Sequence, residues 1–296
     1  MTAPWLVVLA SFLFATMGVC VKFASSQYDA GEIVFYRSIT GTLMMLALAR
    51  WRGGSVRTGV ASMHFWRSLS GVTALCLWFY SIGNLPLATA MTLNYMSSVW
   101  MALFLVGGAV ALGSARVDGR LIATVLLGFA GVALILRPTI AQQQLWYGLM
   151  GLLSGVIAAT AYLQVTALGR AGEPEYRIVF YFSVGGICAG ALTLLWTGLH
   201  AHTLRGAALL LAVGLLATAG QFLMTRAYST GRTLVNASLQ YLGIAFSFAY
   251  GVLLFGDHIT AMALLGMLFI VGAGLSATLL SRRSAAPATA NMTLEA

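Results

Sequence analysis

A nine-residue segment that occurs twice constrains this chain more than any other feature. Residues 33–41 read IVFYRSITG, and residues 178–186, which begin 145 positions later, read IVFYFSVGG. Six of the nine residues are identical. One such match can arise by chance in an apolar chain, so its meaning depends on whether other matches share its offset.

Two further pairs of segments match at nearly the same offset. Residues 80–83 (YSIG) recur as residues 228–231 (YSTG), 148 positions later, and Asn94-Tyr95 is echoed by Gln240-Tyr241 at an offset of 146. Internal repeats at a fixed period decide the architecture of a chain before other signals do. We therefore predict one unit of about 145 residues, duplicated in tandem.

The composition indicates that lipid is the main solvent of this chain. Of its 296 residues, 60% are hydrophobic and only 8% are charged, whereas a soluble domain carries about 25% charged residues. A net charge of +9 can indicate a nucleic-acid partner. Here the basic residues lie in short gaps between apolar runs, so we expect a lipid bilayer as partner and no nucleic acid.

Ten apolar runs are long enough for helices that cross a bilayer, which takes about 20 residues. We predict an all-α integral membrane protein with ten transmembrane helices, arranged as two inverted five-helix repeats. The first repeat would cover residues 3–141 and the second 142–281, followed by a cytoplasmic tail, 282–296. All five prolines lie at or beyond the ends of runs, so no proline-broken span is expected. The runs cover residues 3–23, 31–49, 64–83, 87–108, 118–137, 145–168, 176–197, 206–228, 233–255 and 259–281.

The basic residues also predict the orientation. Lys and Arg stay on the cytoplasmic side during insertion, and an inside N-terminus would place 12 of them there, including Arg67, against 3 outside. Both termini would then face the cytoplasm. Because each repeat has an odd number of spans, the second copy enters the membrane upside down. Inverted repeats of this kind build transporters whose binding site lies near the midplane, between the halves.

Residues for catalysis, metal binding or proton exchange are scarce. No carboxylate is expected in the middle of a span, unless Glu32 lies deeper than its place at a span end suggests, and a proton-driven antiporter usually needs a buried acid. No nucleophile set or metal-ligand spacing stands out. The sequence therefore predicts no enzyme, no cofactor and no metal. We interpret the histidines as solvated surface and the cysteines as packing residues: His64, His200, His202, His258, Cys20, Cys76 and Cys188.

A few polar residues inside spans are the candidates for a site. Arg37 is the one charge expected well inside a span, and it would attract an anion or contact a gate, or else snorkel outward or pair with Glu32. Unpaired amides in hydrocarbon are costly, so they must face one another or a wet cavity. We expect a substrate-binding cavity, with helix–helix hydrogen bonding as the alternative. Its amide and aromatic members would be Asn94, Gln164, Gln221, Gln240, Trp78, Tyr95 and Tyr241.

These features resemble the drug/metabolite transporter superfamily, in its ten-helix EamA-type branch. The resemblance covers about residues 3–281 and depends on the paired IVFY stretches with Arg37, on residues 80–90, and on residues 228–236. Within the branch the chain is most similar to the bacterial aromatic amino acid exporters of the YddG type. The resemblance implies an exporter in the bacterial inner membrane. Small four-helix members use a first-span glutamate for proton coupling, and no acid lies in the first span here.

We therefore expect a multi-pass inner-membrane transporter that exports amino acids, aromatic or neutral, and related small amphiphilic metabolites by alternating access. We expect it to act as a monomer on a small-molecule substrate. Multidrug efflux and nucleotide-sugar or phosphate-ester exchange are the alternatives. The last would need several cations in the cavity, for which the sequence offers only Arg37 and Lys22. An integral-membrane enzyme and a pore are more distant alternatives.

Overall fold

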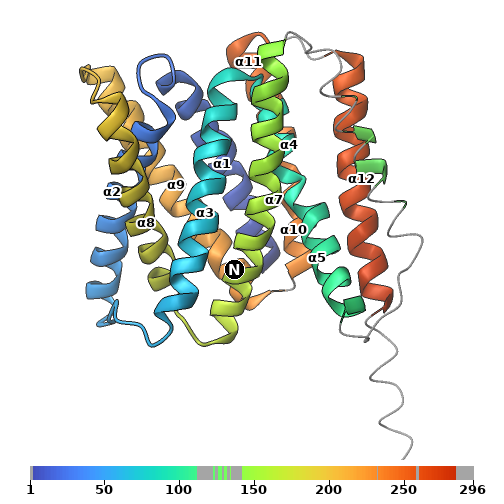
Figure 1. The fold of residues 1–296 in the computed structure, drawn as a ribbon, viewed down its shortest axis with the longest axis horizontal. Coiled ribbons are helices and arrows are strands. Elements are labelled where there is room, and N and C mark those ends of the chain that lie inside the picture. Colours follow the sequence, from blue (N-terminus) through green and yellow to red (C-terminus); the bar gives the residue numbers. More distant parts are fainter. Residues whose placement is uncertain are drawn as a thin grey trace, which may run out of the picture.

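A computed structural model gives the fold as a bundle of helices (Figure 1). It describes residues 3–111, 123, 126–128, 130–131, 134, 142–231, 233–257 and 260–284. Within these ranges every regular element is a helix. Seven helical stretches there are long and apolar enough to cross a membrane, two of which, Leu87–Gly108 and Val235–Phe255, each run over two helices. The fold class is therefore the predicted one, an all-α membrane protein, while the fifth predicted span, 118–137, lies mostly outside the described residues.

The helices follow the predicted apolar runs closely. Thr203 precedes α9 and accepts a hydrogen bond from the amide of Gly206 at 3.0 Å, as a helix-capping residue does. Gly172 and Gly256, in two of the connections, adopt left-handed backbone with φ of 82° and 60°, which glycine tolerates best. The helices are α1 Ala3–Ala24, α2 Ala30–Trp51, α3 Ala61–Asn84, α4 Leu87–Tyr95, α5 Ser97–Ala111, α7 Gln142–Arg170, α8 Glu175–Thr197, α9 Leu204–Thr230, α10 Thr233–Leu239, α11 Leu242–Phe255 and α12 Ala261–Ser284.

Two predicted spans are each divided into two helices. In the span over 87–108, α4 and α5 meet at Met96, where the amide of Val99 donates to the carbonyl of Met96 at 2.9 Å. In the span over 233–255, α10 and α11 meet at residues 240–241, where the amide of Gly243 donates to the carbonyl of Gln240 at 2.9 Å. These bonds join residues three apart, so the helix tightens locally at each place. No proline is involved, and both interruptions fall beside the residue pairs that matched at an offset of 146.

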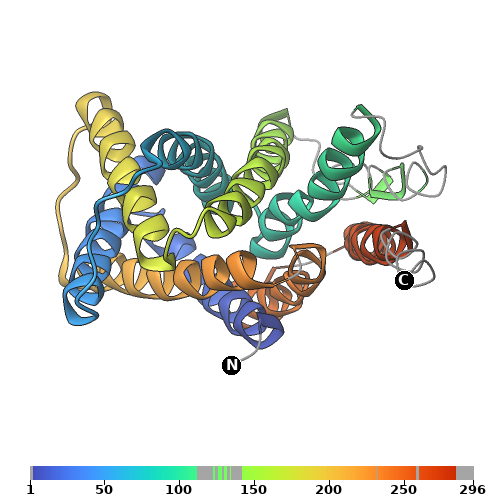
Figure 2. The ribbon, with the colours of Figure 1, turned by 90° about the horizontal axis from the view of Figure 1, so that it is seen from below.

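α2 and α8 pack against each other at one end of the bundle (Figure 2). Small residues lie at their crossing. A Cβ added to Gly41 would lie 2.6 Å from the hydroxyl of Ser183, and one added to Gly186 would overlap the hydroxyl of Ser38. Small residues let two helix backbones approach closely. Ser38 and Ser183 occupy matching places in the repeated segment, as do Gly41 and Gly186, so the two contacts are reciprocal. A two-fold axis through the crossing would exchange them.

The other helix pairs also fit a two-fold relation between the two copies of the repeat. α1 packs on α9, and α3 packs on α7, which is the pairing expected when the first and third spans of each copy swap partners. Contacts within the α2–α8 pair run in opposite directions along the two chains, because Gly31 lies against Thr193 and Gly190 lies against Phe35. The two helices are therefore antiparallel.

Candidate functional site

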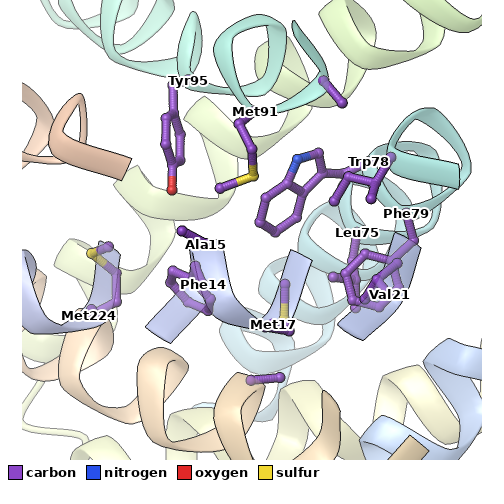
Figure 3. Packing of buried hydrophobic residues seen from close by; sticks show 14 of the residues in the cluster. Phe14, Ala15, Met17, Val21, Leu75, Trp78, Phe79, Met91, Tyr95 and Met224 are labelled. Carbon is purple, nitrogen blue, oxygen red and sulfur yellow. The ribbon is translucent and has the colours of Figure 1, made fainter. Parts of the chain in front are cut away.

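A cavity of about 50 Å³ lies where α1–α4 meet α7–α9. Small-molecule sites usually measure about 300–1,000 Å³, so the helices close around this space and must separate before a metabolite can enter. Figure 3 shows the aromatic part of the wall, with Trp78 of α3 and Tyr95 of α4 directed toward α1. The rings of Phe14 and Trp78 meet edge to face at 6.3 Å. The polar and aromatic lining residues are Phe14, Arg37, Arg67, Trp78, Asn94, Tyr95, Tyr162, Phe182 and Gln221.

A larger groove of about 530 Å³ runs between α11 and α12. Its lining is aliphatic and aromatic, with Tyr241 as its polar member. Few polar groups are available there to fix the orientation of a metabolite. The smaller cavity, which combines cations, amides and aromatic rings, is therefore the candidate site.

The cavity holds two arginines, of which the sequence predicted one. Arg37 and Arg67 are each 4% exposed. Both lie against the ring of Phe182, with guanidinium carbons 5.1 Å and 4.4 Å from its centroid. The prediction that Arg67 is a cytoplasmic surface charge is wrong. It lies near the start of the predicted span 64–83, and α3 begins earlier, at Ala61, which carries Arg67 almost two turns into the helix.

The structure brings five of the eight predicted site residues to the cavity: Arg37, Trp78, Asn94, Tyr95 and Gln221. Asn94 also donates a hydrogen bond through Nδ2 to Ser154 Oγ at 2.9 Å, so it joins α4 to α7. Gln221 donates to Thr225 on its own helix at 3.3 Å. The indole nitrogen of Trp78 and the hydroxyl of Tyr95 are buried, with no hydrogen-bond partner in the described part of the chain.

The other three predicted residues lie outside the lining. Gln240 is fully buried and donates to the hydroxyl of Tyr228 at 3.0 Å. Tyr228 in turn stacks on Tyr162 of the cavity lining, with ring centroids 4.9 Å apart, so Gln240 lies outside the lining and is linked to it by this pair. Gln164 accepts a hydrogen bond from Ser70 Oγ at 2.7 Å, between α7 and α3. Tyr241 lines the apolar groove.

Arg67, Tyr162 and Phe182 are cavity residues that the sequence analysis missed. Arg67 and Phe182 carried a usable signal, because Arg67 lies inside a predicted span and Phe182 takes the place of Arg37 in the second copy of the repeat. Tyr162 carried none, since an aromatic residue in an apolar run is ordinarily a packing residue.

Glu173 joins the α2–α3 connection to the α7–α8 connection on one face of the bundle. This carboxylate accepts hydrogen bonds from Thr58 at 3.0 Å and Arg177 at 3.1 Å, and lies 2.9 Å from His64 Nε2. Burial raises the pKa of the Glu173 carboxyl, but the hydrogen bonds from His64, Arg177 and Thr58 outweigh burial and leave the pKa below its ordinary value. His64 is only 2% exposed, so its interpretation as a solvated histidine is wrong.

Glu32 joins the start of α2 to the α8–α9 connection on the opposite face, which also carries the α1–α2 connection. Its side chain is fully buried, and its Oε2 lies 2.7 Å from His200 Nδ1. The hydrogen bond to Glu32 raises the pKa of the His200 imidazole. Glu32 therefore pairs with His200 and not with Arg37, and it lies in the first turn of α2, away from the middle of the span.

Lys22 and Asp257 join two more connections at this second face. Lys22 Nζ donates to the carbonyl of Leu85 at 3.0 Å and lies 3.6 Å from Asp257 Oδ2. The same carboxylate oxygen accepts the amide of Leu87 at 3.2 Å. Lys22 thus has an acidic partner at the edge of the bundle, and it is no cation of the cavity.

Comparison with known proteins gives concordant matches. Residues 1–137 match the EamA-like transporter family. Over 267 residues the chain is 35% identical to the pseudopaline exporter CntI of Pseudomonas aeruginosa, an alignment that covers 90% of this chain and 92% of that protein. It is 26% identical over 279 residues to an uncharacterized transporter of Helicobacter pylori, with 91% and 92% covered.

A solved structure, described as a crystal structure of a protein, superimposes with a TM-score of 0.68 at 18% identity over 96% of this chain and 98% of that chain. At that identity the superposition shows the fold alone. The family match and a 35% identical exporter aligned over nine-tenths of both sequences show more: this chain belongs to the EamA-like transporter family, and it is a membrane transporter and not an enzyme.

Proposed function

We propose that the chain exports amino acids and related small amphiphilic metabolites that carry a carboxylate, and that the cavity is its binding site. One observation carries the proposal. Buried Arg37, whose Nε has no hydrogen-bond partner among the described residues, shares the cavity with the Asn94 amide and the unpartnered indole of Trp78. A guanidinium suits a carboxylate, amides donate and accept without fixed charge, and aromatic rings can cover an apolar side chain.

The route across the membrane in this proposal is alternating access between two inverted repeats, residues 3–141 and 142–281. The reciprocal serine–glycine contacts of α2 and α8, and their antiparallel course, support this division. In this scheme the contacts of Glu173 on one face and those of Glu32 on the opposite face would break in turn. We place the chain in a bacterial inner membrane as a monomer, with the face of Glu173 in the cytoplasm.

The proposed orientation is tested by fusing reporters to either terminus. Apart from Arg37 the chain has 15 Lys and Arg, of which the sequence analysis places 12 on the cytoplasmic side. Removing the buried Arg67 leaves 11 against 3, so the bias remains. We expect a cytoplasm-dependent fluorescent reporter to work at both ends. A reporter that is active only in the periplasm, working at either end, would contradict the orientation.

Flux through proteoliposomes tests the function. Labelled L-tryptophan, L-glutamine and L-glutamate should each show saturable counterflow, and pseudopaline belongs in the same panel because a relative at 35% identity is named as its exporter. Saturable flux of a cationic dye and of none of these compounds would favour the multidrug alternative. Flux of a nucleotide sugar alone would favour phosphate-ester exchange, which the second cavity arginine makes a serious candidate.

Asn94→Leu is expected to lower flux several-fold while the protein stays folded. A hydrogen bond to a charged group contributes about 1.5–3 kcal/mol, and the substrate would lose one. Gln164→Leu is the matched control, because its amide also bonds a serine across a helix pair but lies outside the cavity. Melting temperature and flux per folded molecule are measured for both. If Asn94 only joins helices, both variants melt lower and neither changes flux per folded molecule.

A further inference from the structure

Arg37 and Arg67 form a pair of cations with no counter-charge among the residues that the structure describes. None of the ion pairs that join described residues includes either of them. Arg37 Nε, Arg67 Nε and Arg67 Nη1 are buried and have no hydrogen-bond partner within the described ranges. Burying a charge is costly unless it is paired, and two like charges beside one ring add their mutual repulsion.

The surroundings of the two arginines provide only weak compensation. Both guanidiniums lie near the face of Phe182, a contact that favours a cation only modestly. The nearby polar groups of the cavity, the Asn94 and Gln221 amides and the Trp78 indole, carry no negative charge. The described carboxylates that form ion pairs, Glu32, Glu173, Glu175 and Asp257, do so with other residues, so within the described ranges the two guanidiniums are left for a negatively charged ligand.

We infer that the site binds substrates with two anionic groups, two carboxylates in the form the geometry favours, one for each guanidinium. This inference rests on the proposed function and specifies its substrate class. Each guanidinium can hold a carboxylate through paired N–H donors, and the two arginines come from different helices, α2 and α3. Each guanidinium can therefore take a carboxylate of its own, whereas a phosphate ester offers one anionic group for two guanidiniums.

Affinities for matched ligands test the inference on the purified full-length protein. L-Glutamate and L-glutamine have the same shape and differ by one carboxylate, and O-phospho-L-serine provides a single dianionic group. Binding constants follow from the dependence of the melting temperature on ligand concentration. We expect wild-type protein to bind L-glutamate about tenfold or more tightly than L-glutamine, as one additional charge-assisted contact implies.

Arg37→Gln and Arg67→Gln should each bring the glutamate-to-glutamine ratio close to one, without lowering the melting temperature of the ligand-free protein, because each removes an unpaired buried charge. Gly71→Ala is a second variant that keeps both charges. A Cβ there would overlap Arg67 Nη1 and press on Phe182, so the guanidinium has to move and the ratio should fall. Arg57→Gln, on the exposed α2–α3 connection, is the control and should leave the ratio unchanged.

Each outcome separates the inference from the proposed function. Equal affinity of wild-type protein for L-glutamate and L-glutamine, with both compounds transported, overturns the inference and leaves the function standing. Tighter binding of O-phospho-L-serine than of L-glutamate overturns the two-carboxylate form. A lower melting temperature with an unchanged ratio in both arginine variants makes the pair structural and also overturns it. If wild-type protein neither binds nor transports any of these compounds, the proposed function fails as well.

Discussion

Gly155→Val is expected to destabilise the protein by at least about 3 kcal/mol, the upper end of the usual cost of overpacking. A Cβ at position 155 would lie 2.8 Å from the carbonyl oxygen of Leu93 and 2.9 Å from that of Asn94. Both atoms belong to backbone at the end of α4, so no side chain can turn away. The two helices α4 and α7 would have to separate at the wall of the cavity. Melting temperature and the yield of monodisperse protein measure the effect.

Gly107→Val is the matched control for this substitution. Gly107 lies on α5, and no atom of another described element stands within 4 Å of the Cβ it would acquire. The loss of glycine's backbone freedom is the same in both variants, so the difference between them isolates the close approach of α7 to α4. Equal melting temperatures would show that this approach contributes nothing to stability.

Glu173→Gln is expected to lower the melting temperature strongly at neutral pH and weakly in acid. The substitution weakens the contacts with His64 and Arg177, and hydrogen bonds to a charged group are worth about 1.5–3 kcal/mol each. Because the pKa of Glu173 is lowered in the folded protein, its stabilisation is present above the ordinary carboxyl pKa and is lost as the pH falls through the lowered pKa. Wild-type and variant melting curves should therefore converge on acidification.

Glu175→Gln is the control for the Glu173 prediction. Glu175 lies two residues away and faces Arg226 at 3.7 Å, but the Arg226 side chain is 50% exposed. An exposed ion pair contributes about 0–1 kcal/mol, so this variant should melt close to wild type at every pH. A difference between wild type and Glu173→Gln that persists unchanged in acid would contradict the assigned role of the carboxylate.

The sequence predicted the helices well because a bilayer imposes a length on each span. It predicted neither interruption. Residues 92–98 contain no proline or glycine that would mark the junction of α4 and α5, and Gly243 at the second junction is one of 33 glycines in the chain. The tightening at Met96 lies beside the backbone contact with Gly155, which only the folded chain reveals.

The candidate site was predictable in part. Amides and aromatic residues inside apolar runs led to Asn94, Trp78, Tyr95 and Gln221. Equivalent repeat positions did not lead to equivalent surroundings, because Asn94 lines the cavity whereas Gln240 bonds Tyr228 outside the lining. Arg67 was missed because a charge near the end of an apolar run is ordinarily in water, and its burial depends on which helices pack around α3.

The crossing of α2 and α8 has a mechanical consequence. Close contacts follow the pair for about three turns of α2, from Gly31 against Thr193 to Gly41 against Ser183. Helices packed this closely over that length resist being pulled apart, so we expect the pair to tilt as one rigid body. Glu32 lies near one end of this body and Glu173 near the other, so a tilt would strain the contacts of one carboxylate while it keeps those of the other. In the proposed alternating access, such a rigid pair would open the interior to each side in turn without a flexible hinge.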